Sequence, residues 1–251
     1  MKDFHVHSSF SADSEEPLEL MILAGLNKHL TDLCFTEHID FGHPNMTFLV
    51  DMPLYLEQLH DFQRKYSGQI RLHAGIELGI EPGNLADSLE FYQEYRDRIE
   101  FWIGSCHVFD GGDPYDCDFF SKMDAQTCYQ DYFEAVLYSI RNFPQADTCG
   151  HLDYVMRFDP SPETYSVEKY SELLDSILKE VIRNECALEL NTGSYRRGFC
   201  EPHPKWSLVR RYQALGGKLV TAGSDAHQSE DVASHFEEIY AGIRSLGLVV
   251  K

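Results

Sequence analysis

The 251-residue sequence predicts an α/β fold, an irregular seven-stranded (β/α)7 barrel formed by a single domain over residues 1–251. Strand-like apolar segments alternate with helix-like amphipathic segments seven times, which predicts parallel strands joined by crossover helices. No linker-like or low-complexity segment interrupts this alternation. Unusual polar residues stand at the C-terminal ends of the predicted strands, which is where a closed β/α barrel carries its functional side chains.

An open, doubly wound sheet is the alternative that the same alternation allows. Such a sheet would gather its ligands mainly at one switch point of the strand order. The sequence instead places histidines and acids after strands along the whole chain, which favours the closed barrel. Seven repeating units in place of the usual eight make the predicted barrel irregular.

The strands are predicted from short apolar or alternating segments that run into glycine or polar residues. They cover residues 3–7, 33–36, 69–78, 101–106, 147–150, 187–190 and 218–222. A short apolar tail, residues 248–250, ends the chain. The longest apolar segments are strand-length, far short of the roughly 20 residues that span a bilayer, so we expect no membrane association.

The helices are predicted from apolar positions three and four residues apart and from proline at helix starts. They cover residues 17–28, 53–65, 85–96, 125–142, 166–184, 204–215 and 231–246. Pro17, Pro53 and Pro204 stand where a first helical turn begins, a position at which a backbone N–H is not needed. The segment 166–184 shows the helical spacing of apolar residues most clearly.

The formal net charge is −20, from 41 acidic and 21 basic residues. Binding to the phosphate backbone of nucleic acid requires a basic surface, so long nucleic acid is excluded as a partner. Bound divalent cations would offset part of this charge, although a plain acidic surface explains most of the carboxylates. The first residues, 1–5, are already polar, so we expect no signal peptide.

The seven cysteines are odd in number and scattered along the chain. They are Cys34, Cys106, Cys117, Cys128, Cys149, Cys186 and Cys200. No pair has the spacing of a structural zinc site. Free thiols in a reducing compartment explain this pattern, so we expect a cytoplasmic protein.

Histidines and acids recur at the ends of the predicted strands. In chain order they are His5, His7, His38, Glu77, His107, His151, Asp225 and His227. Residues two apart in a strand point to the same face, so His-x-His and Asp-x-His each direct two side chains into one space. A single buried histidine is more often a hydrogen-bonded core residue than a ligand. Six of the twelve histidines at successive strand ends, however, predict a metal site.

Neutral imidazoles mixed with carboxylates suit Zn, Mn or Fe(II), and the lack of thiolate ligands favours a catalytic over a structural metal. These ligands exceed what one ion needs, so we expect two or three divalent ions. Asp13, six residues after His7, would by itself be interpreted as a turn or N-cap residue ahead of Pro17.

Glu77 is the residue around which we expect the ligands to gather. It lies between Ile76 and Leu78, and neither Lys nor Arg follows it before Arg96. Burial of a carboxylate is costly unless a cation or hydrogen-bond donors neutralise it. If Glu77 bridges two cations, that cost is offset and each of its oxygens faces a different ion. Clustered ions also lower the pKa of a shared water and stabilise a phosphoryl transition state, which favours phosphate-ester hydrolysis.

Six motifs resemble those of the PHP (polymerase and histidinol phosphatase) family, in order and spacing, over essentially the whole chain. They are residues 3–13 (DFHVHSSFSAD), 36–38 (TEH), 75–77 (GIE), 105–107 (SCH), 150–153 (GHLD) and 223–227 (GSDAH). The chain length and the segments 150–157 and 188–196 resemble the histidinol-phosphatase branch more than the polymerase-embedded branch.

The resemblance implies a trinuclear metal site. One ion would be held by His5, His7, Glu77 and Asp225, the second by Glu77, His107 and His151, and the third by Asp13, His38 and His227. Glu77, Asp225 and His227 would contribute to catalysis through this cluster.

The resemblance also implies two arginines that bind the substrate phosphate. Arg157 and Arg196 match these positions, and the planar guanidinium group suits phosphate because it pairs with two oxygens at once. The small residues 191–194 depart from the usual order of the family, so the adjacent Arg197 is the alternative to Arg196. An ordinary surface charge is the plainer interpretation of either arginine.

The activity implied by the resemblance is hydrolysis of L-histidinol phosphate, a small phosphorylated substrate of histidine biosynthesis. A metal-bridging hydroxide would attack phosphorus in line, and the ions and arginines would carry the developing charge. A phosphodiesterase, an exonuclease or a nucleotide phosphatase would use the same metal chemistry and is the alternative. A non-catalytic metal-binding module is a further alternative, which the complete ligand set disfavours.

Other polar residues on the same predicted face have weaker assignments. Glu37 and Asp153 would orient the ligating imidazoles, or are plain loop residues. His43, His203 and Glu201 would contact the leaving group, or are exposed to solvent.

Overall fold

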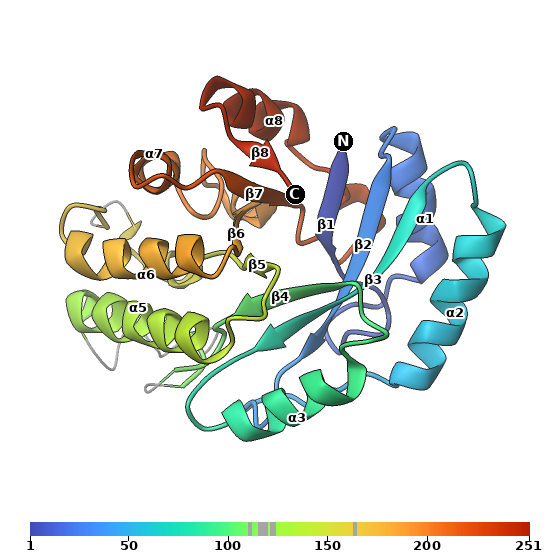
Figure 1. The fold of residues 1–251 in the computed structure, drawn as a ribbon, viewed down its shortest axis with the longest axis horizontal. Coiled ribbons are helices and arrows are strands. Elements are labelled where there is room, and N and C mark those ends of the chain that lie inside the picture. Colours follow the sequence, from blue (N-terminus) through green and yellow to red (C-terminus); the bar gives the residue numbers. More distant parts are fainter. Residues whose placement is uncertain (110–111, 115–119, 121–123, 163–164) are drawn as a thin grey trace.

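The structure is a computed structural model that describes the chain except residues 110–111, 115–119, 121–123 and 163–164. Cys117 therefore lies outside the described residues. In the rest of the chain, eight parallel strands form one sheet, and the helices form an outer ring around the strands (Figure 1). The α/β class with parallel strands and crossover helices is therefore confirmed.

The strands follow one another in space in the order in which they occur in the chain. They are β1 (Lys2–Val6), β2 (Asp32–Ile39), β3 (Arg71–Gly79), β4 (Phe101–Ser105), β5 (Thr148–Cys149), β6 (Ala187–Asn191), β7 (Leu219–Gly223) and β8 (Val249–Val250). This sequential order lacks the reversal that creates the switch point of a doubly wound sheet.

The sheet curls until its first strand meets the segment that follows β7. A parallel bridge joins Val6 to Ala226, the N–H of His7 donates to the Ala226 carbonyl at 2.9 Å, and the N–H of Asp225 donates to the His5 carbonyl at 2.7 Å. The C-terminal ends of β1 and β7 are thereby brought to the same rim of the sheet.

The predicted strand number of seven is wrong by one, because the tail also pairs with the sheet. Val249 and Val250 form β8 in register with Leu219 and Val220 at the start of β7. A strand of two residues is too short to show an alternating pattern, so the sequence revealed only an apolar tail.

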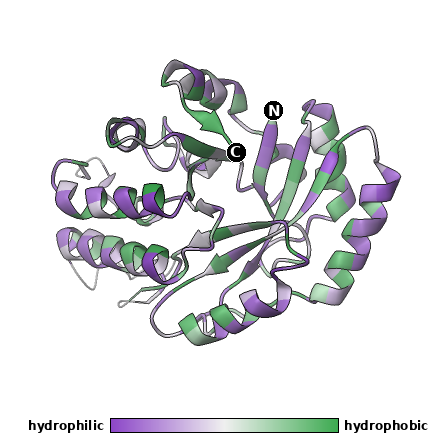
Figure 2. Cartoon of the chain, viewed as in Figure 1, coloured by the Kyte–Doolittle hydropathy of each residue, from purple (hydrophilic) through white to green (hydrophobic). Residues whose placement is uncertain are grey.

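The helices alternate with the strands, and most of them match the predicted ranges. They are α1 (Leu18–Asn27), α2 (Met52–Lys65), α3 (Leu85–Tyr95), α5 (Ala125–Asn142), α6 (Ser171–Arg183), α7 (Trp206–Ala214) and α8 (Phe236–Ser245), with short 3-10 helices η1 (Tyr154–Arg157), η3 (Thr192–Arg197) and η4 (Ser229–Asp231). Hydrophobic and hydrophilic residues alternate along α2, α5 and α6 (Figure 2). This alternation lets a helix turn one side to the sheet and the other to solvent.

Three helices begin later than predicted. α6, α7 and α8 start between two and five residues after the predicted positions, because turns or a short 3-10 helix occupy the preceding residues. Helix ends are the least certain part of a sequence-based assignment, because turns share the helical residue preferences.

The core lies between the strands and the surrounding helices. Tyr55 of α2 shows how a helix is fixed to the sheet: its buried hydroxyl donates to the Phe35 carbonyl at 2.9 Å and accepts from the Gly75 N–H at 3.2 Å. The six described cysteines are free, and all except Cys200 are buried. None of the described helices has the length and apolar character required to cross a membrane.

Candidate metal centre

Glu77 lies near the C-terminal end of β3, and its side chain is completely buried. Its Oε1 is 3.1 Å from Nε2 of His107, which follows β4, and 2.9 Å from Nε2 of His151, which follows β5. The Ser105 hydroxyl donates to the same oxygen at 2.6 Å. One oxygen of Glu77 therefore faces the imidazoles at the ends of β4 and β5.

The other oxygen of Glu77, Oε2, faces histidines from β1 and β2. It lies 2.9 Å from Nε2 of His5, 3.5 Å from Nε2 of His7 and 3.2 Å from Nδ1 of His38. His38 is the register neighbour of Glu77 in the parallel β2–β3 pair, which explains its closeness. The two oxygens of Glu77 thus divide the imidazoles into two sets, the arrangement expected of a carboxylate that bridges two cations.

Asp225 closes the site from the segment after β7. Its Oδ1 lies 3.5 Å from Nε2 of His7 and 3.7 Å from Nε2 of His5. Its Oδ2 accepts a hydrogen bond of 2.9 Å from Nη2 of Arg157. The backbone φ of Asp225 is 55°, an uncommon value for a non-glycine residue. The hydrogen bond from its N–H to the His5 carbonyl holds this conformation in place.

Asp13, His38 and His227 form the outer part of the group. Oδ2 of Asp13 lies 3.1 Å from Nε2 of His227 and 3.6 Å from Nε2 of His38. The buried ring of His7 stacks between His38 and His227, with centroid distances of 4.2 and 4.3 Å. Asp13 thereby joins the histidines, which its place in a polar loop does not by itself reveal.

All nine residues predicted to bind metal therefore meet at one rim of the sheet. Four overlapping groups in the described part of the chain have the spacing that a metal ion requires. They are His5–His7–Asp225, His5–Glu77–His151, His38–Glu77–His107 and His7–His38–His227. Shared members link all four groups, so the side chains form one continuous cluster.

Ring nitrogens without partners show that these residues fit metal ions. Nε2 of His7 and Nδ1 of His38 are buried and have no hydrogen-bond partner among the described residues. Nε2 of His7 instead faces one oxygen of Glu77 and one of Asp225, each 3.5 Å away. A buried polar atom without a partner is costly, and a divalent cation satisfies imidazole and carboxylate atoms together.

Charge and burial favour the metal-binding protonation states of Glu77 and His7, whereas neighbouring carboxylates outweigh burial and raise the pKa values of His5, His38 and His107. Burial opposes ionisation of Glu77, but His5, His38 and His107 outweigh burial and hold its pKa well below the usual range. Burial lowers the pKa of His7 well below its usual value, and the neighbouring His38 adds to this effect. An ionised carboxylate and a neutral imidazole are the forms that coordinate a cation.

Glu37 supports His7 through Ser11. Oε2 of Glu37 accepts the Ser11 hydroxyl proton at 2.6 Å, and the Ser11 oxygen lies 3.3 Å from Nδ1 of His7. Because that hydroxyl donates to Glu37, Nδ1 of His7 is the donor to Ser11. Nε2 of His7 then keeps its lone pair for the cluster. The predicted orienting role of Glu37 is therefore exerted through a serine.

Two buried acids that the sequence interpretation omitted contact the cluster histidines from the far side. Asp40, directly after β2, lies 2.8 Å from Nδ1 of His107, and Glu189 of β6 lies 2.5 Å from Nδ1 of His5. A carboxylate behind an imidazole fixes the ring and makes its other nitrogen a better ligand. Glu189 stands between two leucines, so the pattern that singled out Glu77 could also have identified it.

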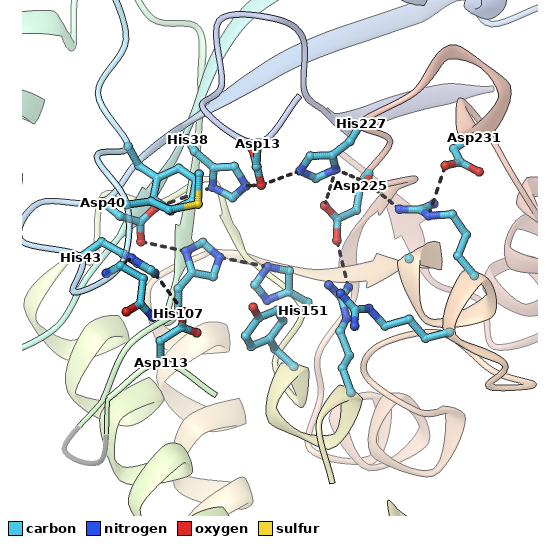
Figure 3. Close-up of a pocket in the computed structure, with 18 of the residues that line it drawn as sticks. Asp13, His38, Asp40, His43, His107, Asp113, His151, Asp225, His227 and Asp231 are labelled. Carbon is cyan, nitrogen blue, oxygen red and sulfur yellow. Dashed lines mark hydrogen bonds and ion pairs between the residues drawn. The ribbon is translucent and has the colours of Figure 1, made fainter. Parts of the chain in front are cut away.

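A cavity of about 800 Å³ opens onto the cluster. In Figure 3, His43 and Asp113 lie at one side of this cavity and Asp231 lies at the other, with His107 and His151 between them. The cavity therefore extends from the metal-binding side chains in two directions, towards His43 and Asp113 on one side and towards Asp231 on the other.

Arg157, at the end of η1, lines the cavity next to the cluster. Its side chain is 6% exposed, and its Nη2 donates to Asn191 Oδ1 and Asp225 Oδ2, both at 2.9 Å. Its buried Nε has no hydrogen-bond partner among the described residues. Hydrogen bonds from Nη2 thus fix the guanidinium group, and its positive charge lies beside the cluster.

Arg196 and Arg197 of η3 line the same side of the cavity. Arg196 donates to the backbone carbonyls of Ser224 and Asp225, and its Nε lies 3.4 Å from Oδ2 of Asp231. The guanidinium of Arg197 lies 5.1 Å from the ring of Phe158. Arg196 therefore braces the segment that carries Asp225, while both arginines reach the cavity.

Among the weaker candidates, only His43 lines the cavity. His203 is neither exposed nor at the cavity: it is buried, and its Nδ1 contacts Asp153 at 2.7 Å. Asp153 thus holds His203 and not a cluster imidazole, so its predicted role is wrong. Glu201 accepts the Trp206 N–H at 2.9 Å at the start of α7, which makes it a structural residue.

Comparison with known proteins places this site in a family. The sequence model of the PHP domain matches residues 3–193. The chain belongs to the PHP domain family. As a PHP protein it is 32% identical over 235 residues to the histidinol-phosphatase of Lactococcus lactis subsp. lactis (strain IL1403), which covers 90% of this chain and 83% of the relative. It is 30% identical over 241 residues to a probable histidinol-phosphatase of Clostridium acetobutylicum, which covers 94% and 89%.

Solved structures of other proteins resemble this PHP chain as a whole. The crystal structure of the Lactococcus lactis histidinol phosphate phosphatase, described as complexed with zinc, L-histidinol and phosphate, has a TM-score of 0.90 at 29% identity. The match covers 99% of this chain and 94% of that one. A putative histidinol phosphatase from Listeria monocytogenes has a TM-score of 0.77 at 19% identity and shares the fold.

Proposed function

We propose that this chain is a metal-dependent phosphatase that hydrolyses L-histidinol phosphate to L-histidinol and phosphate, a step of histidine biosynthesis. The observation that carries the proposal is the cluster around Glu77, which adjoins a cavity lined by arginines. The Lactococcus lactis relative supports the choice of substrate, because its structure is described with zinc, L-histidinol and phosphate.

Two or three divalent ions belong to the proposed active site. His5, His7, Glu77 and Asp225 would hold one ion, Glu77, His107 and His151 would hold the second, and Asp13, His38 and His227 would hold the third. The two-sided contacts of Glu77 support the first two assignments, and the position of Asp13 between two imidazoles supports the third. Zinc, manganese and iron all accept such nitrogen and oxygen ligands, and zinc is the metal described for the relative.

When bound, the ions supply a water of lowered pKa and offset negative charge on the phosphoryl group. The side chains of this chain position the substrate. Arg157 binds a phosphate oxygen while its contact with Asp225 keeps the guanidinium beside the cluster. Arg196 donates two of its five N–H groups to backbone carbonyls and pairs its Nε with Asp231, so N–H groups remain for the phosphate, with Arg197 as the alternative.

The charges along the cavity fit a substrate with a phosphate at one end and a cation at the other. Arginines lie near Asp225 and Asp231, whereas Asp113 lies at the other side with His43 (Figure 3). Oδ2 of Asp113 accepts from Nδ2 of Asn45 at 3.1 Å. Histidinol carries an ammonium group, so Asp113 is the proposed acceptor for the cationic end of the leaving group.

The remaining features are proposed from the same observations. Residues 1–251 form one domain, supported by the single sheet to which β1 through β8 contribute. The protein is cytoplasmic, supported by the free thiols of the described cysteines. Its partner is a small phosphorylated molecule and not long nucleic acid, supported by the net charge of −20.

Metal analysis combined with turnover on three substrates tests the proposed function. We expect bound divalent metal, and a kcat/KM for L-histidinol phosphate far above that for p-nitrophenyl phosphate. We expect little hydrolysis of bis-p-nitrophenyl phosphate. Preferred hydrolysis of the diester would instead favour the phosphodiesterase alternative. Bound metal without turnover of any of the three esters would contradict the phosphatase.

A further inference from the structure

Glu189 lies behind the cluster, and it is neither a proposed metal ligand nor a proposed substrate contact. It lies in β6 with 1% exposure. Its Oε1 is 2.5 Å from Nδ1 of His5, and its Oε2 accepts the backbone N–H of His151 at 2.6 Å. Nδ2 of Asn191 donates to Oε2 as well, at 3.3 Å. One buried carboxylate thus contacts β1, the segment that follows β5 and its own strand.

The sheet leaves space for this carboxylate at one glycine. A Cβ added to Gly223 of β7 would collide with Oε1 of Glu189 and with Cβ of His5. A side chain at position 223 would therefore displace the carboxylate or the imidazole. The backbone on three neighbouring strands, β1, β6 and β7, is consequently arranged around the contact between Glu189 and His5.

The hydrogen bonds of Glu189 favour a proton on Nδ1 of His5. Oε2 of Glu189 accepts two N–H groups, which identifies the side chain as an acceptor. Nδ1 of His5 is then the donor to Oε1. Nε2 of His5, which lies 2.9 Å from Oε2 of Glu77, is then the nitrogen that can offer its lone pair when a cation is bound.

We propose that Glu189 is a positioning residue for metal: it fixes the Nδ1–H tautomer of His5 and the backbone of His151, and so sets the affinity of the cluster for its ions. His5 and His151 face different oxygens of Glu77. A single acid on β6 therefore orients ligands on both sides of the bridging carboxylate. This proposal rests on the metal cluster of the proposed function but not on the identity of the substrate.

The variant Glu189→Gln tests this role with nearly unchanged shape. An amide offers one oxygen and one NH₂ group, so an NH₂ group must face either His5 or the N–H of His151. Facing His5, it selects the tautomer with the proton on Nε2, which cannot bind metal. We expect metal dissociation constants, measured by chelator competition, to rise about 10- to 100-fold. We also expect kcat to recover partly in excess metal while KM for the substrate changes little.

Asp32→Asn is the matched control. Asp32 is also a buried acid that contacts a histidine, with Oδ1 3.1 Å from Nε2 of His73, but it lies at the opposite end of the strands. We expect its metal affinity to equal that of the wild type. Equal metal affinity in Glu189→Gln and the wild type would overturn the proposal. Loss of metal in both variants would overturn it too, since it would indicate that any substitution of a buried acid in the sheet disturbs the metal site.

The wild-type protein decides the question if Glu189→Gln does not fold. In the zinc-loaded protein with ¹⁵N-labelled histidine, NMR should find His5 protonated at Nδ1. A proton on Nε2, or a metal-bound Nδ1, would overturn the proposal. These readouts separate it from the proposed function: inactivity towards L-histidinol phosphate with normal metal binding contradicts only the latter. Unchanged metal affinity in the variant contradicts only the role of Glu189.

Discussion

Histidines and carboxylates meet at both ends of the sheet, but the acidic charge is balanced by different partners at each end. At the N-terminal end, Asp32 accepts two hydrogen bonds of 2.7 Å from Arg71 and lies near His73. At the C-terminal end, the buried Glu77 contacts imidazoles and the hydroxyl of Ser105. Asp32 thus has a permanent cation as its main partner, whereas Glu77 contacts only titratable rings and a hydroxyl among the residues named here.

This difference separates a structural group from a binding site. Arg71 is always charged, so the group around Asp32 is complete without any ligand and contributes only to stability. Imidazoles coordinate metal in their neutral form, and in that form they leave the charge of Glu77 uncompensated. The buried carboxylate is therefore compensated either by protonated imidazoles or, once those rings are neutral, by divalent cations, which is the property expected of a metal centre.

Removal of the central acid should give the largest effect. Glu77→Ala takes away the side chain whose two oxygens face imidazoles on both sides of the proposed cluster. We expect loss of bound metal and a fall in turnover of at least about 1,000-fold. Metal analysis and steady-state kinetics measure both, with Asp32→Asn expected to keep its metal and its turnover. Full metal content and activity in Glu77→Ala would contradict the cluster.

Substitution of Arg157 at the C-terminal end should lower activity much more than substitution of Arg71 at the N-terminal end. Arg157→Ala removes a proposed phosphate donor and leaves Asp225 without the guanidinium group that contacts it, so kcat/KM should fall about 100- to 1,000-fold. Arg71→Ala removes the partner of Asp32 and should leave kcat/KM within about twofold, at a cost of about 1 kcal/mol in unfolding free energy. Similar kinetic losses in the two variants would show that the ends of the sheet are not functionally distinct.

The sequence was sufficient for the parts of the site that depend on strand order. Parallel strands in sequential order place all their C-terminal ends on one rim, so residues at strand ends converge whatever the details of the loops. For that reason the positions of Glu77, His107 and His151 followed from the pattern alone. Asp225 also converges, because the segment after β7 pairs with β1.

Contacts that depend on loop packing could not be predicted in this way. The pairing of His203 with Asp153 joins residues fifty positions apart through the loops after β5 and β6. Asp40 was omitted because β2 extends through Ile39, three residues beyond the predicted end, which brings Asp40 to the rim beside His107. Neither contact leaves a periodic pattern in the sequence, because each depends on where two separate segments meet.

The acidic side of the cavity should affect specificity more than catalysis. Asp113→Asn keeps the size of the side chain and removes the charge proposed to bind the cationic end of L-histidinol phosphate. We expect KM for that substrate to rise about tenfold, equivalent to about 1.4 kcal/mol, with kcat nearly unchanged. Kinetics on p-nitrophenyl phosphate, which has no cationic group, should change by less than about twofold. Equal changes for both substrates would contradict a role in recognising the cation.

The smallest predicted effect concerns the N-terminal end and its response to acid. Burial opposes ionisation of Asp32, but Arg71 and His73 outweigh burial and lower its pKa from 3.8 to about 2. Because the folded-state pKa is the lower one, ionised Asp32 stabilises the fold above about pH 4, and this contribution is lost as the pH falls towards about 2. Arg71 is 69% exposed, so solvent screening limits the contribution to about 1 kcal/mol.

Urea unfolding of the wild type and Asp32→Asn at several pH values measures this contribution. The difference in unfolding free energy should be about 1 kcal/mol near neutral pH and should shrink below about pH 4, where the unfolded wild type takes up a proton that the variant cannot. A difference that stays constant from about pH 6 to about pH 3 would mean that the charge of Asp32 is not what stabilises this end. Asp32→Asn would then test only side-chain packing and would no longer be a charge-matched control for the metal variants. The comparison of the ion pair of Asp32 and Arg71 with the cluster around Glu77 would no longer be a comparison of charge compensation at the two ends of the sheet.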